Sequence, residues 1–389
     1  MDISTLGQRF RRNIQTYVII IALVAIWGVF AIVTKGGFLG PQNISNLFRQ
    51  MTVTGFLAIG MVLVMVTGGI DLSVGKLAGF VSVIVALFQR DVWFKLIPNQ
   101  PLLAAALSVL VGLMVGGLFG MYQAYIIAYL RVPAFIVTLG GMFILNGGIL
   151  LATGGKTIAA NQPVFSAIGQ GYIKAPTNWI IGVGVVLILF FLMFQNRRAK
   201  IKYGFELKPI IQDVLRTAFF SALILIYLFV VNKFNGVPIP VVILAVTAII
   251  VSYMSTNTRF GRYAYAIGGN REAARLSGIN IKKEIFLIFT LMGLLCGIGG
   301  IVLASYVGYG TIAAGQGYEL DAIASCVLGG TSTLGGSGTI FGALVGALIM
   351  ASLNTGLQMM NVAPAWQYVL RGFVLVLAVV IDVYFKKSN

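Results

Sequence analysis

The amino-acid sequence predicts an all-α polytopic membrane protein, and three observations lead to this fold class. Hydrophobic residues make up 59% of the 389 residues and charged residues only 10%, whereas a soluble domain carries about 25% charged residues. Apolar runs of roughly 20 residues recur along the chain, which is the length that a helix needs to cross a bilayer. These runs lack the alternation of apolar and polar residues that a membrane β-strand shows. The spans are therefore expected to be helices.

About twelve spans are predicted, all within one transmembrane domain covering residues 1–389. One of them, 318–328, is short for a complete crossing and is expected to be a short or broken helix enclosed by protein. The predicted spans are 17–34, 51–67, 72–88, 102–128, 132–153, 178–194, 217–231, 237–254, 285–306, 318–328, 339–357 and 365–384.

The basic residues predict the orientation of these spans. Of the 27 Lys and Arg residues, 18 fall in segments on the side of the N-terminus, seven on the opposite side and two within spans. Basic residues collect in cytoplasmic segments, so both termini, including residues 1–16, are predicted to be cytoplasmic. The same holds for two basic loops, 195–216 and 255–284. Contact with anionic lipid accounts for the net charge of +17, and no nucleic-acid partner is expected.

The loop 255–284 contains a small helix with its own start and stop signals. Asn270 is a suitable N-cap, Glu272 lies where a first helical turn favours negative charge, and Gly278 can end the helix in the left-handed conformation. A polar helix of two turns between apolar spans has no core of its own, so we expect another protein to bind it. The alternative is a loop attracted to anionic lipid at about 1 kcal/mol per basic residue, which requires no caps.

Glycines mark both packing faces and breaks in the spans. Gly112, Gly116 and Gly120 fall four residues apart, a spacing that lets a neighbouring helix approach closely. The glycine-rich stretches 68–75 and 329–336 each follow a span, on the same side of the membrane in this topology. Such matching breaks are typical of a transporter with pseudo-repeated halves, and coincidence in a chain with 48 glycines is the alternative.

Few carboxylates could lie at membrane depth, where a buried charge usually has a function. For Glu319 and Asp321 the alternative is a charge that complements the start of a helix. Asp71 could instead hydrogen-bond backbone N–H groups of its own break and fix the turn. The candidates for the translocation path or its breaks are Gly69, Asp71, Ser73, Asn146, Glu319 and Asp321.

Catalysis and metal binding find no support in the sequence. The chain has no histidine, which removes the usual general base and the commonest metal ligand. It contains no phosphate-binding loop of the Walker A type, and Cys296 and Cys326 lie in apolar sequence. We therefore expect no catalytic residue, no metal site and no cofactor bound by this chain.

Four runs of residues resemble the ABC-importer permeases of the ribose/xylose/galactose family. They are residues 266–280, which include Glu272-Ala273-Ala274 and Gly278, and the runs 318–332, 68–75 and 132–140. The resemblance covers nearly the whole chain. Within the family it is greatest to the xylose permease, because residues 178–231 add a pair of spans with a basic inner loop that ribose-type members lack.

This resemblance implies a transport subunit rather than an enzyme. It implies a homodimer in the cell inner (plasma) membrane, a separate ATP-binding cassette subunit that holds ATP and Mg, a periplasmic or extracellular sugar-binding protein, and a monosaccharide substrate, with D-xylose first. By position, the helix that couples to the ATPase comprises Asn270, Arg271, Glu272, Ala273, Ala274, Arg275, Leu276 and Gly278. The alternative function is a secondary sugar transporter driven by an ion gradient, which would need paired intramembrane carboxylates.

Overall fold

The structure is a computed structural model that describes residues 19–387 except 206 and 208. The first helix is described from Ile19 to Val33. The elements that follow in its first half are η1 (Gly37–Leu39), α2 (Pro41–Val66), α3 (Val74–Leu87), η2 (Phe88–Trp93), α4 (Phe94–Leu96), α5 (Pro101–Ala128), α6 (Ala134–Thr153), β1 (Ile158–Ala159), α7 (Pro163–Gln170), β2 (Tyr172–Ile173) and α8 (Thr177–Lys202). The second half contains α9 (Ile210–Asn232), β3 (Val237–Pro238), α10 (Ile239–Asn257), α11 (Arg259–Gly269), α12 (Arg271–Leu276), α13 (Ile281–Val307), β4 (Tyr309–Gly310), α14 (Tyr318–Leu328), α15 (Ile340–Met359) and α16 (Pro364–Lys387).

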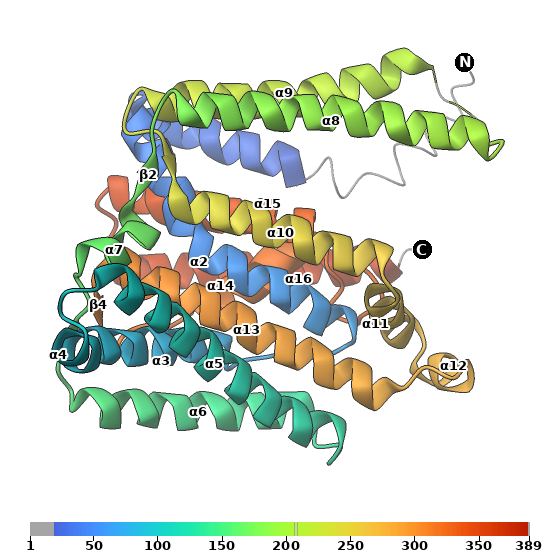
Figure 1. Cartoon of the computed structure of the whole chain (residues 1–389). Coiled ribbons are helices and arrows are strands. Elements are labelled where there is room, and N and C mark those ends of the chain that lie inside the picture. Colours follow the sequence, from blue (N-terminus) through green and yellow to red (C-terminus); the bar gives the residue numbers. More distant parts are fainter. Residues whose placement is uncertain (1–18, 206, 208, 388–389) are drawn as a thin grey trace.

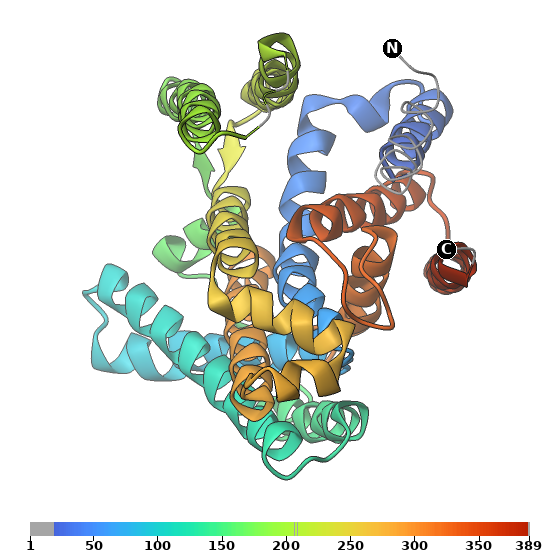
Figure 2. The ribbon, with the colours of Figure 1, turned by 90° about the vertical axis from the view of Figure 1, so that its right-hand side faces the viewer.

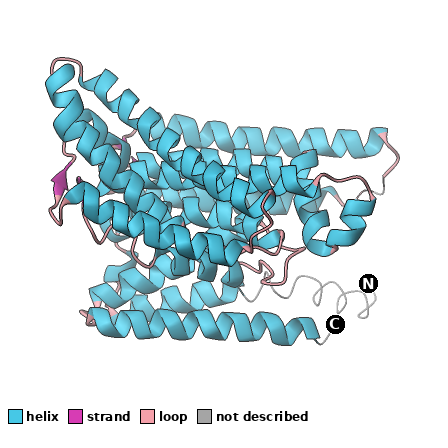
Figure 3. Ribbon diagram, turned by 90° about the horizontal axis from the view of Figure 1, so that it is seen from below, coloured by secondary structure: helices cyan, strands magenta, loops and turns pink. Residues whose placement is uncertain are grey.

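The long helices run along one common axis, which gives the bundle two distinct ends (Figures 1 and 3). At one end β1 pairs with β4 and β2 pairs with β3, both antiparallel; we call this the strand end. The short helices α11 and α12 lie at the opposite end (Figure 1), which we call the α12 end. The last helix, α16, also finishes at the α12 end.

The predicted polytopic helical fold is confirmed. Among the described residues, nine helices are long and apolar enough to cross a membrane: α2, α3 continued by η2 and α4, α5, α6, α8, α9, α10, α13 and α15. The first helix, α14 and α16 account for the other predicted spans. The count of twelve crossings, the cytoplasmic termini and the repeated halves stay predictions, and residues 1–16 lie outside the described part of the chain.

Two helices form the centre of the bundle. We compare the most apolar 18-residue segment of each helix. Of this segment 78% is buried in α2 and 67% in α13, against 11% in α8 and 17% in α9. Figure 2 shows α8 and α9 as a pair that stands apart from the other helices. Their exposed side chains are apolar, including Phe191 and Phe219, so this pair suits contact with lipid.

Close packing of α5 on α13 follows from glycine, as predicted. A β-carbon on Gly116 would lie 2.5 Å from the carbonyl oxygen of Gly293 and 2.8 Å from the Cα of Gly297. The two backbones therefore touch with no side chain between them, the arrangement that small residues allow in membrane helices.

The stretch 195–216, predicted as a basic cytoplasmic loop, is mostly helical, and its cytoplasmic location stays a prediction. Helix α8 continues to Lys202 and α9 begins at Ile210, which leaves only residues 203–209 between them. Lys and Arg are good helix formers and are favourable in a last turn, so the basic run extends α8 instead of ending it. An ion pair of 2.8 Å joins Arg197 on α8 to Asp213 on α9.

Candidate coupling site

Helix α12 is short but closed at both ends, as the sequence predicts. The Asn270 side-chain oxygen accepts a hydrogen bond of 2.9 Å from the Ala273 N–H. At the other end Gly278 has φ +82°, its N–H donates to the Arg275 carbonyl at 3.0 Å, and the N–H of Ile279 donates to the Ala274 carbonyl at 3.1 Å. This pair of bonds is the Schellman arrangement. Six helical residues would be marginal alone, so the caps are what defines this helix.

The outward face of α12 combines charge with an apolar tip. Arg275 and Glu272 form an ion pair of 3.0 Å with both side chains mostly exposed, which contributes little to stability in water. Leu276 is 81% exposed although its side chain is apolar. Ala274 is buried against the bundle while Ala273 faces outward, so only one of the two alanines is available to a partner.

Helix α11 fixes α12 to the bundle. Its buried residues Gly261, Ala264 and Ile267 lie on one face. The Tyr265 hydroxyl donates a hydrogen bond of 2.7 Å to the carbonyl of Gly338. Burial raises the pKa of Tyr265 above its usual range, partly offset by a hydrogen bond from the Ser255 side chain, so the phenol stays protonated and can donate.

The last turn of α11 meets both glycine-rich stretches at one point. The N–H of Gly336 donates to the carbonyl of Val66, the last residue of α2, at 2.9 Å. A β-carbon on Gly268 would lie against that same carbonyl oxygen, and one on Gly335 would lie 3.3 Å from the Gly68 nitrogen. We call Val66, Gly68, Gly335 and Gly336 the glycine junction, which Gly268 of α11 contacts. The two predicted breaks thus lie on the same side, as expected, and they touch.

Asp71 fixes the turn that leads from the glycine junction into α3. Its carboxylate accepts hydrogen bonds from the N–H and the hydroxyl of Ser73, at 2.8 and 2.7 Å. The Ser73 oxygen also lies 3.1 Å from the side-chain amide of Gln123 on α5. The predicted backbone contact of Asp71 is therefore present, and both Asp71 and Ser73 are buried.

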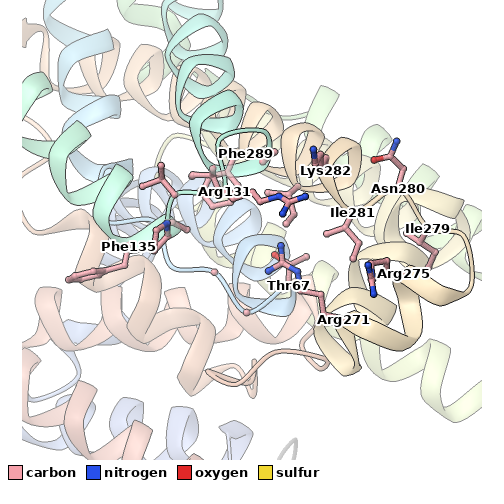
Figure 4. A pocket seen from close by; sticks show the side chains of 18 of the residues that line it. Thr67, Arg131, Phe135, Arg271, Arg275, Ile279, Asn280, Ile281, Lys282 and Phe289 are labelled. Atoms are coloured by element: carbon pink, nitrogen blue, oxygen red, sulfur yellow. The ribbon is translucent and has the colours of Figure 1, made fainter.

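A basic cleft opens between α12 and the neighbouring helix ends (Figure 4). Its volume is about 880 Å³. The residues of its walls come from the connection 67–70, the α5–α6 connection, α12 and the start of α13. Four basic residues line it against one acidic residue, Glu272; they are Arg131, Arg271, Arg275 and Lys282. We use the name basic cleft for the space that these residues line, and Gly69 also lies in its wall.

The remaining predicted path residues divide between two places. Asn146 and Glu319 line a second cavity, together with Lys76 and Gln316. Asp321 is buried and instead pairs with Arg371 of α16 at 3.6 Å. Both acids lie in the first turn of α14, the position where they complement a helix start.

Sequence reasoning did not single out Arg131, Lys282, Lys76 or Gln316. Lys76 carried a usable signal, because a lone cation within an apolar span is rare and usually functional. Arg131 and Lys282 looked like ordinary basic residues of cytoplasmic segments, which set the orientation of a membrane protein. Only the folded chain brings them to one cleft with α12.

Comparison with known proteins places this arrangement in a family. A family model described as the permease component of a branched-chain amino acid transport system matches residues 43–379. The chain belongs to this family of membrane transport subunits, and it is a multi-pass protein of the cell inner membrane rather than an enzyme.

Individual relatives are similar along nearly their whole length. The Xylose transport system permease protein XylH of Haemophilus influenzae is 41% identical, over 97% of this chain and 98% of the relative. The protein of the same name from Escherichia coli K12 is 40% identical, over 97% and 94%. The Ribose import permease protein RbsC of Escherichia coli K12 is 33% identical, over 93% and 92%. No solved structure matches the chain. The predicted resemblance is thus confirmed, with greater identity to the xylose permeases than to this ribose permease.

Proposed function

We propose that this chain is the permease subunit of an ATP-driven monosaccharide importer, with D-xylose as the leading substrate. In this proposal two copies form the sugar path, a cassette ATPase binds at the α12 end, and a sugar-binding protein delivers substrate at the strand end. ATP and Mg are held by the ATPase. The relatives named as xylose permeases support the choice of sugar.

The observation that carries the proposal is the construction of the α12 end. Helix α12 is rigidly capped, presents an exposed Leu276 and an ion pair, and stands beside the basic cleft. An apolar side chain at the tip of a polar helix is suited to seat in a pocket of a partner, with charges at the rim. Lipid attraction alone would need only the positive charges.

The basic cleft suggests how the ATPase is oriented. Arg131 and Lys282 come from elements other than α12, and together with Arg271 and Arg275 they extend the positive surface beyond that helix. An acidic segment of the ATPase facing this cleft would fix the docking angle, because complementary charge mainly sets orientation and association rate.

Movement of α12 has a direct route into the bundle. Helix α11 contacts the glycine junction, where the stretch that follows α14 meets the stretch that leads into α3. The ATPase can shift the transporter between two states only by the difference in its contacts with each. We infer that displacement of α11 changes the packing at the glycine junction and so the opening of the path.

The test exchanges the two residues of the α12 ion pair, Glu272 and Arg275. The double variant Glu272→Arg with Arg275→Glu keeps an ion pair within the helix but reverses the pattern shown to a partner. In proteoliposomes with the ATPase and the sugar-binding protein, we expect sugar-stimulated ATP hydrolysis and sugar uptake to fall sharply. Membrane insertion should be unchanged. Uptake equal to that of the unsubstituted chain would refute the role of α12.

A matched variant tests whether exchanging an ion pair elsewhere in the chain would also lower uptake. Arg197 of α8 and Asp213 of α9 form an ion pair of 2.8 Å, and Figure 2 shows these two helices standing apart from the others. Exchanging these two residues should leave ATP-stimulated uptake unchanged. Equal loss in both exchanges would show that the α12 result is not specific.

A further inference from the structure

Two helices begin inside the bundle and meet at their first turns. A β-carbon on Gly75 of α3 would lie 2.5 Å from the carbonyl oxygen of Gly315 and 2.9 Å from the backbone nitrogen of Glu319. A β-carbon on Gly79 would lie against the carbonyl oxygen of Ala314. The starts of α3 and α14 are therefore in backbone contact.

The depth of this meeting point follows from α14. Its 11 residues span about 16 Å at 1.5 Å per residue, and the stretch that follows α14 reaches the glycine junction at the α12 end through Gly335 and Gly336. The hydrocarbon core of a bilayer is about 30 Å thick. The starts of α3 and α14 thus lie about halfway through the membrane-spanning bundle.

A cavity of about 450 Å³ opens at this meeting point. Its polar lining comes from three elements: Lys76 in the first turn of α3, Asn146 of α6, and Gln316 and Glu319 at the start of α14. Apolar side chains, including Met142 and Phe143, complete the wall. We call this space the mid-bundle cavity.

The polar side chains that line the mid-bundle cavity do not satisfy one another's hydrogen-bonding groups. Within the described part of the chain, one carboxylate oxygen of Glu319 is buried against Gly75 without a hydrogen-bond partner, which leaves its other oxygen to face the cavity. In that same part, Lys76 forms no ion pair with Glu319, and the side chains of Asn146 and Gln316 form no hydrogen bond. Donors and acceptors therefore remain available for a ligand between α3, α6 and α14.

The cavity cannot face lipid at this depth without a large cost. A Lys at the centre of a bilayer costs at least about 2.5 kcal/mol even on insertion scales, and the amides of Asn146 and Gln316 would lose their hydrogen bonds with water. The cavity must therefore face a water-filled path. One cation balances one carboxylate, so the lining suits a neutral ligand rich in hydroxyl groups, with apolar side chains against the ring.

We propose that the mid-bundle cavity is the site that binds the sugar halfway along its path. The sugar's hydroxyl groups form hydrogen bonds with Lys76, Asn146, Gln316 and Glu319. This inference rests on the proposed function and names the sugar-contacting residues for it. The stretch that follows α14 reaches the glycine junction through Gly335 and Gly336, so a displacement there that moves α14 changes the shape of the cavity wall.

Accessibility of single cysteines tests the proposal in the full complex. The native Cys296 and Cys326 are fully buried and should not react with a membrane-impermeant methanethiosulfonate reagent. Asn146→Cys should react, and D-xylose should slow the reaction. Ile144→Cys is the matched control on α6: it is exposed on the bundle surface but does not line the cavity, and it should stay unlabelled in lipid.

The labelling has two outcomes that overturn the proposal. Failure of Asn146→Cys to react would show that no water-filled path reaches the cavity. D-xylose, L-arabinose and D-ribose are tested one at a time. If Asn146→Cys reacts and none of the three sugars slows the reaction, the cavity contains water but binds no sugar.

Transport separates failure of this inference from failure of the proposed function. We expect Glu319→Gln and Asn146→Ala to slow sugar uptake by about tenfold, the order expected when a ligand loses one hydrogen bond, while ATP hydrolysis stimulated by the binding protein continues. Ile144→Ala should behave like the unsubstituted chain. Unchanged uptake in both cavity variants overturns only the sugar-binding site proposed here. Absence of ATP-driven sugar uptake by the unsubstituted complex overturns the proposed function.

Discussion

The contact between α11 and the glycine junction can be broken by a single methyl group. In Gly268→Ala the added carbon would lie against the Val66 carbonyl oxygen and 2.7 Å from the Gly336 nitrogen. Both are backbone atoms, which cannot turn aside as the end of a flexible side chain can. The neighbouring Gly269 offers a matched control, since a β-carbon there meets nothing within 4 Å. Neither glycine has a positive φ, so alanine is compatible with the backbone at both positions.

The size of the effect follows from the contacts that are lost. The hydrogen bond from Gly336 to Val66 contributes about 0.5–1.5 kcal/mol, and overpacking a close contact costs about 1–3 kcal/mol. Alanine at a helical position returns up to about 1 kcal/mol. With the central value of each range and the full helix gain, Gly268→Ala should weaken this contact by about 2 kcal/mol, and Gly269→Ala should leave it intact.

The assay measures ATP hydrolysis stimulated by the loaded sugar-binding protein in proteoliposomes. A coupling free energy of about 1–3 kcal/mol corresponds to a change of roughly 5- to 150-fold, so Gly268→Ala should reduce stimulation by at least about fivefold. Gly269→Ala should match the unsubstituted chain, and both variants should still co-purify with the ATPase. The reasoning is refuted if Gly268→Ala couples normally or if both variants fail equally.

Three further predictions concern other contacts. Asn270→Ala should destabilise α12 by about 1 kcal/mol, seen as faster hydrogen exchange over residues 271–276, whereas Asn270→Asp should retain protection; equal exchange in all three chains would contradict the cap. Gly116→Val should separate α5 from α13 at the contact with Gly293 and lower the midpoint of thermal unfolding in detergent, and an unchanged midpoint would disprove that packing. Arg371→Met should destabilise the chain by about 3–5 kcal/mol because it leaves buried Asp321 without its partner. Adding Asp321→Asn should recover most of that loss, and no recovery would argue against the pair.

Local signals in the sequence were sufficient for α12 and α14. The caps of α12 involve residues no more than five positions apart, so Asn270 and Gly278 reveal the helix by themselves. Glycines flank α14, with Gly317 at φ +80° before it, and its predicted bounds of 318 and 328 are correct. The turn at Asp71 is equally local, because both hydrogen-bond donors belong to Ser73.

Contacts between distant segments could not be predicted from one sequence. Gly336 bonds to Val66 and Glu319 lies beside Gly75, yet nothing near either residue indicates its partner. The basic cleft could not be predicted either, because Arg131 looked like an ordinary basic residue of a cytoplasmic segment. The helical part of 195–216 was missed for another reason: the end of each apolar run was taken as the end of its helix, although a basic helix can extend beyond the membrane surface.

The account depends on the chain being moved by an ATPase at the α12 end. The most direct measurement is uptake of labelled D-xylose into proteoliposomes that contain the chain with its ATPase and the sugar-binding protein, compared with the chain alone under a proton or sodium gradient. We predict uptake only when the complete assembly has ATP on the ATPase side. Accumulation by the chain alone, driven by an ion gradient without ATP, would contradict the account.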